Sequence, residues 1–374
     1  MKHITYFSLI ILFSYFSCDD PIAPIIFESK VVWTDDVNKP LNLVRPVIEN
    51  DYTYIAADSI IKCLKLENGE LVWETSLGYI SGSIGSSKLL DSGNQLFLNN
   101  NNWVKSFDKI DGKLIWETII DNFNPINFSI MSQNNYSLLL GGQGEVIKLS
   151  KQTGAIELRI KIDELIPAGY TQLAYNPIIS EDGFIYVSTG WFDGAKNKGN
   201  ILCYNSNSGK FVWGSEAPSV VESCALKDSL IVLPSGSTMI SLNRYSGVEV
   251  WKNVINNDGF WESVTINDET VYMGSTALAK MYAFNLRTGK LKWKSEGTKS
   301  SIITIITVQN GRVYFCNFAY IYVLDASTGS VIWKGLPPEY EKDRSYRYSS
   351  PVAVGEGYLV CIGNKKVYCL TDPQ

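Results

Sequence analysis

Short stretches rich in β-branched and aromatic residues are spread along this 374-residue chain, and polar turns interrupt them at regular intervals. Two such stretches flanking a polar turn are the sequence pattern of a β-hairpin. The pattern occurs eight times, in residues 46–56, 88–98, 129–140, 177–187, 224–233, 263–273, 305–315 and 351–360. It predicts an all-β protein built from a repeated hairpin unit.

A Gly-x-x-x-Trp motif follows most of the hairpins. Its copies are Gly69…Trp73, Gly112…Trp116, Gly209…Trp213, Gly247…Trp251, Gly289…Trp293 and Gly329…Trp333, and a further copy has Leu158 after Gly154. Successive glycines are 43, 42, 55, 38, 42 and 40 residues apart, a period typical of four-stranded propeller blades. Polar residues before each glycine favour a tight turn in which glycine adopts a positive φ.

The tryptophans of the repeat are expected to pack between neighbouring blades. Burying one such ring contributes roughly 4–6 kcal/mol before opposing terms are counted. We interpret these rings as structural rather than as a ligand platform. The predicted structural set is Trp33, Trp73, Trp116, Trp213, Trp251, Trp293 and Trp333.

The two ends of the chain complete one blade between them. The last hairpin is followed by a third strand, 366–370, and the chain stops before a fourth. Residues 29–33 end in the same Val-Trp pair as residues 71–73. Pairing this N-terminal strand with the last three strands closes the ring and leaves no open sheet edge. We predict an eight-bladed β-propeller of four-stranded antiparallel blades over residues 29–374.

Through this repeat the chain resembles the quinoprotein-like (PQQ-like repeat) propellers over residues 29–371. Within that superfamily it is similar to the BamB family, the propeller lipoproteins of the outer-membrane β-barrel assembly machine. The Gly-His and Trp-Asp marks of WD40 repeats are absent. The resemblance implies a non-enzymatic scaffold of the cell envelope, with β-barrel assembly components as partners.

The N-terminus reads as a targeting segment. Lys2 and His3 precede an apolar run, 4–16, which is too short to span a bilayer. The run stops at Ser17-Cys18, as in a bacterial lipoprotein signal. We predict a signal peptide at 1–17, acylation of Cys18 and a tether over 18–28; an ordinary cleaved signal is the alternative. The predicted location is the cell envelope, with the outer membrane favoured and the leaflet left open.

Residue chemistry excludes several function classes. The only histidine is His3, which leaves with the signal peptide, so the mature chain has no histidine for a catalytic triad or an imidazole metal site. The net charge of −5 and the absence of a basic block argue against nucleic-acid binding. We predict no catalytic residue, no metal site and no cofactor. The cysteines fit small buried positions of the repeat, and a disulfide between Cys361 and Cys369 is left open.

The superfamily resemblance also raises a redox alternative, a dehydrogenase that uses pyrroloquinoline quinone and calcium. Such enzymes carry a Cys-Cys pair and longer substrate loops, which this chain lacks. The alternative would need calcium ligands at the channel mouth, such as Glu222 or Glu262.

Loop length points to one face of the ring as the binding face. The connections between blades and between the second and third strands are long, whereas the other turns are tight. Long loops on a rigid ring commonly carry binding function. They comprise 34–45, 119–127, 161–176, 253–262 and 334–349, together with the insertion 190–200.

Aromatic residues and arginine, the types that dominate interface hot spots, gather on these connections. The candidate partner-binding residues are Trp103, Trp191, Phe192, Phe260, Trp261, Tyr340, Arg344 and Arg347, with Tyr346 and Tyr348 in the same segment. Self-packing of the rim is the competing interpretation. We expect a protein-binding scaffold, and a glycan or small-molecule sensor is the alternative function.

Overall fold

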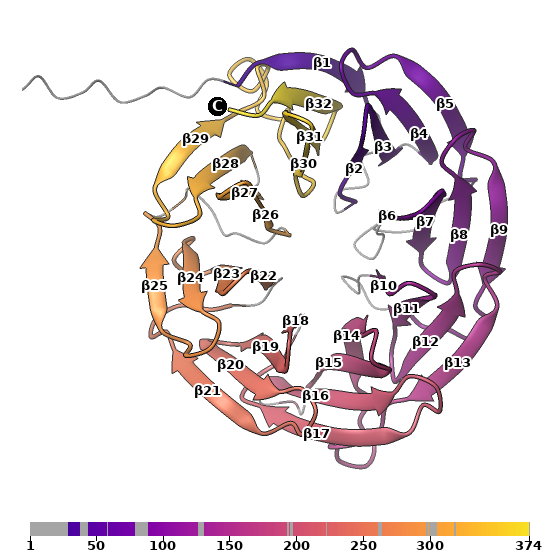
Figure 1. The fold of residues 1–374 in the computed structure, drawn as a ribbon, viewed down its shortest axis with the longest axis vertical. Coiled ribbons are helices and arrows are strands. Elements are labelled where there is room, and N and C mark those ends of the chain that lie inside the picture. The colour runs from indigo at the N-terminus through magenta and orange to yellow at the C-terminus, as the bar shows by residue number, and fades with distance from the viewer. Residues whose placement is uncertain are drawn as a thin grey trace, which may run out of the picture.

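A computed structural model describes residues 29–37, 44–57, 59–78, 89–125, 131–192, 194, 197–221, 223–260, 264–296, 298, 305–317 and 319–373. These residues form eight four-stranded sheets arranged as blades around a central axis (Figure 1). The predicted all-β, eight-bladed propeller is confirmed. The predicted signal peptide 1–17, Cys18 and the tether 18–28 lie outside the described residues.

The first four blades run from the innermost to the outermost strand in chain order. Blade 1 contains β2 (Val47–Glu49), β3 (Tyr52–Ala57), β4 (Ile60–Lys65) and β5 (Leu71–Ser76). Blade 2 contains β6 (Leu89–Ser92), β7 (Gln95–Asn100), β8 (Trp103–Asp108) and β9 (Leu114–Ile119). Blade 3 contains β10 (Ser132–Gln133), β11 (Ser137–Gly141), β12 (Glu145–Ser150) and β13 (Ile156–Lys161). Blade 4 contains β14 (Leu173–Ile179), β15 (Phe184–Phe192), β16 (Asn197–Asn205) and β17 (Phe211–Ala217).

The remaining blades follow the same order, except that the chain's first strand is the outermost strand of the last blade. Blade 5 contains β18 (Ala225–Lys227), β19 (Leu230–Ser235), β20 (Thr238–Asn243) and β21 (Glu249–Val254). Blade 6 contains β22 (Thr265–Asn267), β23 (Thr270–Gly274), β24 (Met281–Asn285) and β25 (Leu291–Lys294). Blade 7 contains β26 (Thr307–Gln309), β27 (Arg312–Asn317), β28 (Tyr320–Asp325) and β29 (Val331–Gly335). Blade 8 contains β30 (Ala353–Gly355), β31 (Tyr358–Ile362), β32 (Lys366–Thr371) and β1 (Val31–Asp36).

The ring closes where β1 pairs antiparallel with β32, as the sequence predicted. Backbone hydrogen bonds flank this seam: the Thr371 N–H donates to the Lys30 carbonyl at 2.9 Å, and the Val37 N–H donates to the Lys365 carbonyl at 2.8 Å. The Ser29 hydroxyl adds a bond to the Thr371 carbonyl at 2.6 Å. The two ends of the described chain are therefore held together in one sheet (Figure 1).

Tryptophan side chains join the blades at six of the eight junctions. The indole Nε1–H of Trp73 donates to the Lys109 carbonyl at 2.9 Å, and that of Trp213 donates to the Arg244 carbonyl at 3.0 Å. The same contact joins Trp33 to Leu66, Trp116 to Lys151, Trp251 to Leu286 and Trp293 to Ala326. A buried indole N–H needs a partner, so this bond lets a large ring fill the inter-blade core without a desolvation penalty. Trp333 is partly buried and packs against the core between blades 7 and 8.

The junction between blades 3 and 4, where Leu158 replaces the tryptophan, is built differently. Leu158 packs against Gly209 without a polar contact from its side chain. Backbone hydrogen bonds cross this junction near the axis instead: the Gly144 N–H donates to the Gln172 carbonyl at 2.7 Å, and the Ala174 N–H donates to the Gly142 carbonyl at 3.0 Å.

The cysteines of the described chain are all free and buried. Cys369 pairs in register with Val360, whereas Cys361 pairs with Tyr368. Since neighbouring positions on a strand face opposite sides of a sheet, Cys361 packs toward blade 7 and Cys369 toward blade 1. The disulfide that the sequence left open is therefore not formed.

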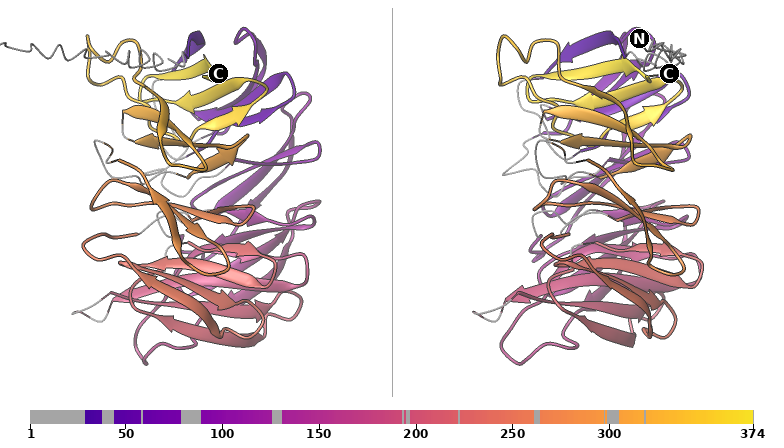
Figure 2. Two further views of the ribbon diagram at one scale, coloured as in Figure 1. Left: turned by 60° about the vertical axis from the view of Figure 1, so that its left-hand side comes forward. Right: turned by 90° about the vertical axis from the view of Figure 1, so that its left-hand side faces the viewer.

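Antiparallel order divides the connections between two faces of the ring. Turns after the first and third strands of each blade lie on one side, which we call the tight-turn face. Connections after the second and fourth strands lie on the other, which we call the long-connection face. Figure 2 shows the ring from the side. No helix among the described residues could cross a membrane.

Candidate functional site

The candidate site lies on the long-connection face of blade 4, where one hairpin is longer than the others. The insertion 190–200 was expected to be an irregular loop, but most of it extends β15 and β16 as a regular ladder. Trp191 pairs with Lys198, and Phe192 pairs with Asn197. The extension therefore carries two aromatic residues outward on hydrogen-bonded backbone rather than on a loose loop.

Three aromatic residues lie on this hairpin and the connection before it, and two of their rings are in contact. We call Tyr170, Trp191 and Phe192 the aromatic cluster. The rings of Tyr170 and Trp191 are 5.1 Å apart, centroid to centroid, at an interplanar angle of 58°. Phe192 is 60% exposed, and Tyr170 is also exposed. Sequence reasoning missed Tyr170, because a single tyrosine in a polar connection carries no pattern that would place it beside Trp191.

Buried polar side chains form a hydrogen-bond network at the base of the hairpin that carries Trp191 and Phe192. Gln172 is fully buried, and its side-chain oxygen accepts hydrogen bonds from the Thr189 hydroxyl at 2.7 Å and the Asn200 amide at 2.9 Å. Its own amide donates to the Glu164 carbonyl at 2.6 Å. These bonds tie the connection before β14 to both strands of the long hairpin. A fully satisfied buried network of this kind fixes one arrangement of the segments it joins.

Glu164 adds a second link between the same segments. Its carboxylate accepts a hydrogen bond from the Tyr204 hydroxyl on β16. Burial and this bond raise the pKa of Tyr204, so its hydroxyl stays protonated and remains the donor at neutral pH. The Asn200 amide also donates to the Leu165 carbonyl at 3.1 Å.

The segment rich in tyrosine and arginine forms a second exposed surface on the connection between β29 and β30. The Arg344 guanidinium lies 4.7 Å from the centroid of the Tyr340 ring, a cation–π contact. Arg347 Nε donates to the Arg344 carbonyl at 2.9 Å. Both arginines are exposed. We call Tyr340, Arg344 and Arg347 the Tyr/Arg surface.

This second surface is anchored to the turn between β31 and β32. The Tyr348 ring is fully buried and packs edge-on against Tyr368 at 5.1 Å. The Asp343 carboxylate pairs with Lys365 Nζ at 2.9 Å. Hydrogen bonds from Ser345 and from Lys365 lower the pKa of Asp343 to about 2. Tyr348 is thus an internal anchor, Tyr340 is partly buried, and the two arginines are exposed.

The other predicted residues lie away from these two surfaces or in the core. Trp103 begins β8 on blade 2, and the Lys105 ammonium lies 5.0 Å from its ring centroid. Phe260 is only 1% exposed and packs edge-on against Tyr282 at 5.4 Å. Its side chain belongs to the core, so we remove it from the candidate surface. Trp261 lies outside the described residues.

The candidates fall into two groups: Trp191 and Phe192 are consecutive residues of β15, and Tyr340, Arg344 and Arg347 contact one another. Blade 4, with the aromatic cluster, and blade 8, which anchors the Tyr/Arg surface, lie on opposite sides of the ring (Figure 1). Trp103 is on blade 2, away from both. The long-connection face therefore carries separate exposed groups instead of one continuous site.

The dehydrogenase alternative would require calcium-binding carboxylates near the channel mouth. Glu222 and Glu262 lie outside the described residues. Across the described part of the chain, no three acidic, cysteine or histidine side chains are grouped so that they could hold a metal ion.

Comparison with known proteins identifies a family and several structures of similar fold. A family model described as outer membrane protein assembly factor BamB matches residues 100–334. No curated protein gives a significant match to the chain.

Three solved structures are similar to this chain, at sequence identities that establish the fold alone. BamB from Moraxella catarrhalis has a TM-score of 0.66 and 13% identity, over 92% of this chain and 100% of that chain. The computationally designed Ika8 protein has a TM-score of 0.68 and 14% identity, over 90% and 98%. The C-terminal WD40 domain of Sif2 has a TM-score of 0.69 and 9% identity, over 94% and 100%.

Proposed function

Because this chain belongs to the family of the outer membrane protein assembly factor BamB, we propose that it is a lipid-anchored, non-enzymatic scaffold that binds a protein of the cell envelope. The family match confirms the resemblance predicted from the repeat. In the specific form of the proposal, the partner is a component of outer-membrane protein assembly.

The aromatic cluster is the observation that carries the proposal. It exposes the Phe192 ring on a hairpin whose base is fixed by the bonds of Gln172. Exposed aromatic side chains on a rigid support lose little conformational entropy when a partner covers them. Such rings are also the residue type that contributes most to protein–protein interfaces. The proposed primary contact is therefore blade 4, and the Tyr/Arg surface is a second contact for a partner that spans the ring.

The proposed lipid anchor would attach the ring at its rim. The residues after Cys18 lead into β1, which is the outermost strand of blade 8. Replacing Cys18 with serine should abolish incorporation of labelled fatty acid and release the protein from the membrane fraction. Retention of label by the Cys18→Ser variant would contradict acylation at this position.

Crosslinking in native membranes tests the partner proposal. We compare the wild type with Phe192→Ala and with a Tyr136→Ala control, which removes an exposed tyrosine from the tight-turn face. The wild type and Tyr136→Ala should crosslink to the same envelope protein, and Phe192→Ala should lose most of that product while melting at the same temperature. Equal crosslinking by all three proteins would exclude the aromatic cluster as the contact.

A glycan or small-molecule sensor is the competing function, and one observation favours it. The Trp191 indole nitrogen is buried and has no hydrogen-bond partner within the described structure, so a polar ligand reaching it would gain a bond. Titration with a panel of glycans should quench tryptophan fluorescence in a saturable way if the sensor function is right. If no glycan changes the fluorescence, the sensor function is excluded and the scaffold function is favoured.

A further inference from the structure

Two junctions on the tight-turn face, between blades 1 and 2 and between blades 4 and 5, are built from equivalent residues. In each, the tryptophan Nε1–H of the first blade donates to the carbonyl of a cationic residue in the second: Trp73 to Lys109, and Trp213 to Arg244. The Lys109 backbone N–H donates to the Asn94 carbonyl, and the Arg244 backbone N–H donates to the Ser229 carbonyl, both at 2.9 Å. The equivalent pairs also include Tyr54 and Tyr186, Cys63 and Cys203, Val72 and Val212, and Tyr52 and Phe184.

A half-exposed tyrosine covers the junction between blades 4 and 5. The Tyr245 ring lies edge-on to Phe184, with centroids 6.1 Å apart. Its hydroxyl accepts a hydrogen bond from Arg244 Nη2 at 2.7 Å and donates to the Asp182 carboxylate at 3.1 Å. A phenol therefore sits in this slot with its ring against an aromatic wall and its hydroxyl between a cation and a carboxylate.

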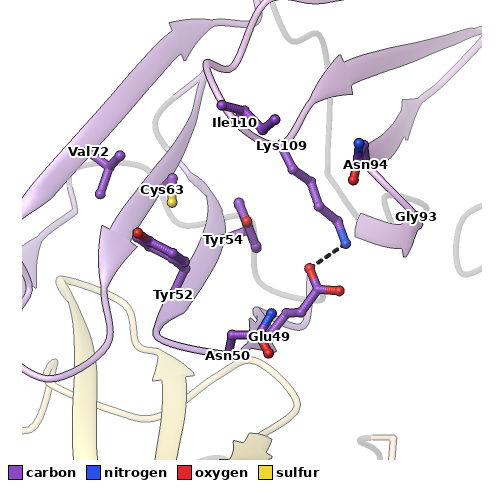
Figure 3. Close-up of a pocket in the computed structure, with 10 residues that line it drawn as sticks. All are labelled: Glu49, Asn50, Tyr52, Tyr54, Cys63, Val72, Gly93, Asn94, Lys109 and Ile110. Carbon is purple, nitrogen blue, oxygen red and sulfur yellow. Dashed lines mark hydrogen bonds and ion pairs between the residues drawn. The ribbon is translucent and has the colours of Figure 1, made fainter.

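The equivalent slot between blades 1 and 2 is open. Ile110 replaces the tyrosine and is 74% exposed, and a pocket of about 330 Å³ lies beside it. Figure 3 shows the Lys109 ammonium meeting the Glu49 carboxylate next to Tyr54. Lys109 is only 6% exposed, and its Nζ lies 2.5 Å from the Glu49 carboxylate oxygen and 3.7 Å from that of Asp91.

We propose that this pocket binds a phenolic ring in the place that Tyr245 occupies at the other junction. The ring lies against Tyr52 and Val72, and its hydroxyl accepts from Lys109 Nζ and donates to the Glu49 carboxylate. The site is on the face opposite the aromatic cluster and does not depend on the proposed function.

The charges select a neutral phenol over other aromatic ligands. Glu49 and Asp91 together carry one more charge than Lys109 neutralises, so an aromatic carboxylate would be repelled. A ring without a hydroxyl would cover the ion pair and offer it no hydrogen bond, which costs free energy in a partly buried site. Burial also raises the pKa of the Cys63 thiol to about 12, so the pocket holds a neutral thiol and binding is non-covalent.

Ligand-observed NMR with the whole protein tests the proposal. N-acetyl-tyrosinamide should bind in a saturable way, about tenfold more tightly than N-acetyl-phenylalaninamide, because only the former bonds to the charged pair. p-Cresol and the tripeptide Gly-Tyr-Gly separate the two sources of a phenol. Tighter binding of the tripeptide identifies a tyrosine side chain as the ligand, and tighter binding of p-cresol identifies a free phenol.

Two reciprocal variants locate the site. Ile110→Tyr should fill the pocket as Tyr245 does, and should abolish binding of N-acetyl-tyrosinamide without lowering the melting temperature. Tyr245→Ile should open the second slot and double the number of phenols bound per chain. The proposal is overturned if no phenol binds saturably, if the tyrosine and phenylalanine probes bind equally, or if a folded Ile110→Tyr variant binds as the wild type does.

Discussion

The indole ring of Trp293 lies directly over Gly329 of the following blade, so that a β-carbon on this glycine would come within 2.4 Å of the ring. The same contact occurs between Trp73 and Gly112 and between Trp251 and Gly289. The glycine and the tryptophan of the repeat motif therefore meet across blade boundaries. Six tryptophans, Trp33 to Trp293, lie over the glycine of the following copy in this way, which explains why the two residues recur together along the chain.

Replacing Gly329 with alanine should destabilise the protein by about 2–5 kcal/mol. Its φ of +75° adds about 1–2 kcal/mol of backbone strain for alanine, and the clash with Trp293 adds about 1–3 kcal/mol of overpacking. Gly311 is the matched control, because its φ is +71° and no atom lies within 4 Å of an added β-carbon. Urea denaturation should show a clearly smaller loss for Gly311→Ala. Equal losses would mean that the tryptophan contact contributes nothing.

The two aromatic pairs that look alike in the sequence should respond differently to truncation. Phe260→Ala should lower the free energy of unfolding by about 3–5 kcal/mol, because it empties a core position. Phe192→Ala should change it by less than about 0.5 kcal/mol, because the ring is mostly exposed. Thermal and urea melts of both variants provide the comparison. A large loss for Phe192→Ala would show that this ring is packing rather than a contact surface.

The Tyr/Arg surface should loosen in strong acid. The pKa of Asp343 is lowered to about 2 in the folded protein, below the value of about 3.9 expected for the unfolded chain. Its contribution to stability is therefore present above about pH 4 and is lost as the pH falls through 2. A carboxyl-carbon NMR titration should find the Asp343 midpoint near pH 2, and protection of nearby amides should fall with it.

Asp343→Asn should remove this acid-dependent loosening and leave the segment equally protected from pH 4 to pH 2. Glu341→Gln is the control, since it leaves the contacts of Asp343 with Ser345 and Lys365 in place. An Asp343 midpoint near pH 4 would show that these contacts do not hold in solution.

The buried cysteines should report unfolding. Burial raises the pKa of Cys63, Cys203, Cys224 and Cys369 to about 12, and the thiolate is the reactive form. At pH 8 the native protein should resist alkylation at these four positions, and labelling should rise with urea concentration along the unfolding curve. Mass spectrometry of digests assigns each site. Fast labelling of any of them in native buffer would contradict the buried state.

The fold was predictable because its signal repeats. Each hairpin could be matched against seven others, and the strand ending at Trp33 supplied the missing member of the last blade. The turn glycines were also expected, but only for their φ. The contact of each glycine with the tryptophan of the preceding copy was not expected. This contact joins residues of different repeats, so no local sequence pattern indicates it.

The candidate site was less predictable, since it depends on side-chain direction in segments that occur only once. Phe192 and Phe260 both lie next to a tryptophan in a connection, yet one is exposed and the other is buried. The difference arises because the Phe260 N–H donates to the Gly236 carbonyl at 2.7 Å, which draws this connection inward against blade 5. No feature of residues 258–261 in the sequence indicates that bond.

The seam between β1 and β32 also imposes an order on biosynthesis. Ser29 and Thr371 are 342 positions apart, so at ordinary translation rates the N-terminal strand waits roughly 20–70 s for its partner. During that interval its edge is open to other chains, which is a known route to aggregation. The propeller can therefore close only after essentially the whole polypeptide has been delivered, and chaperones that shield the early strand should matter more for its yield than for its final stability.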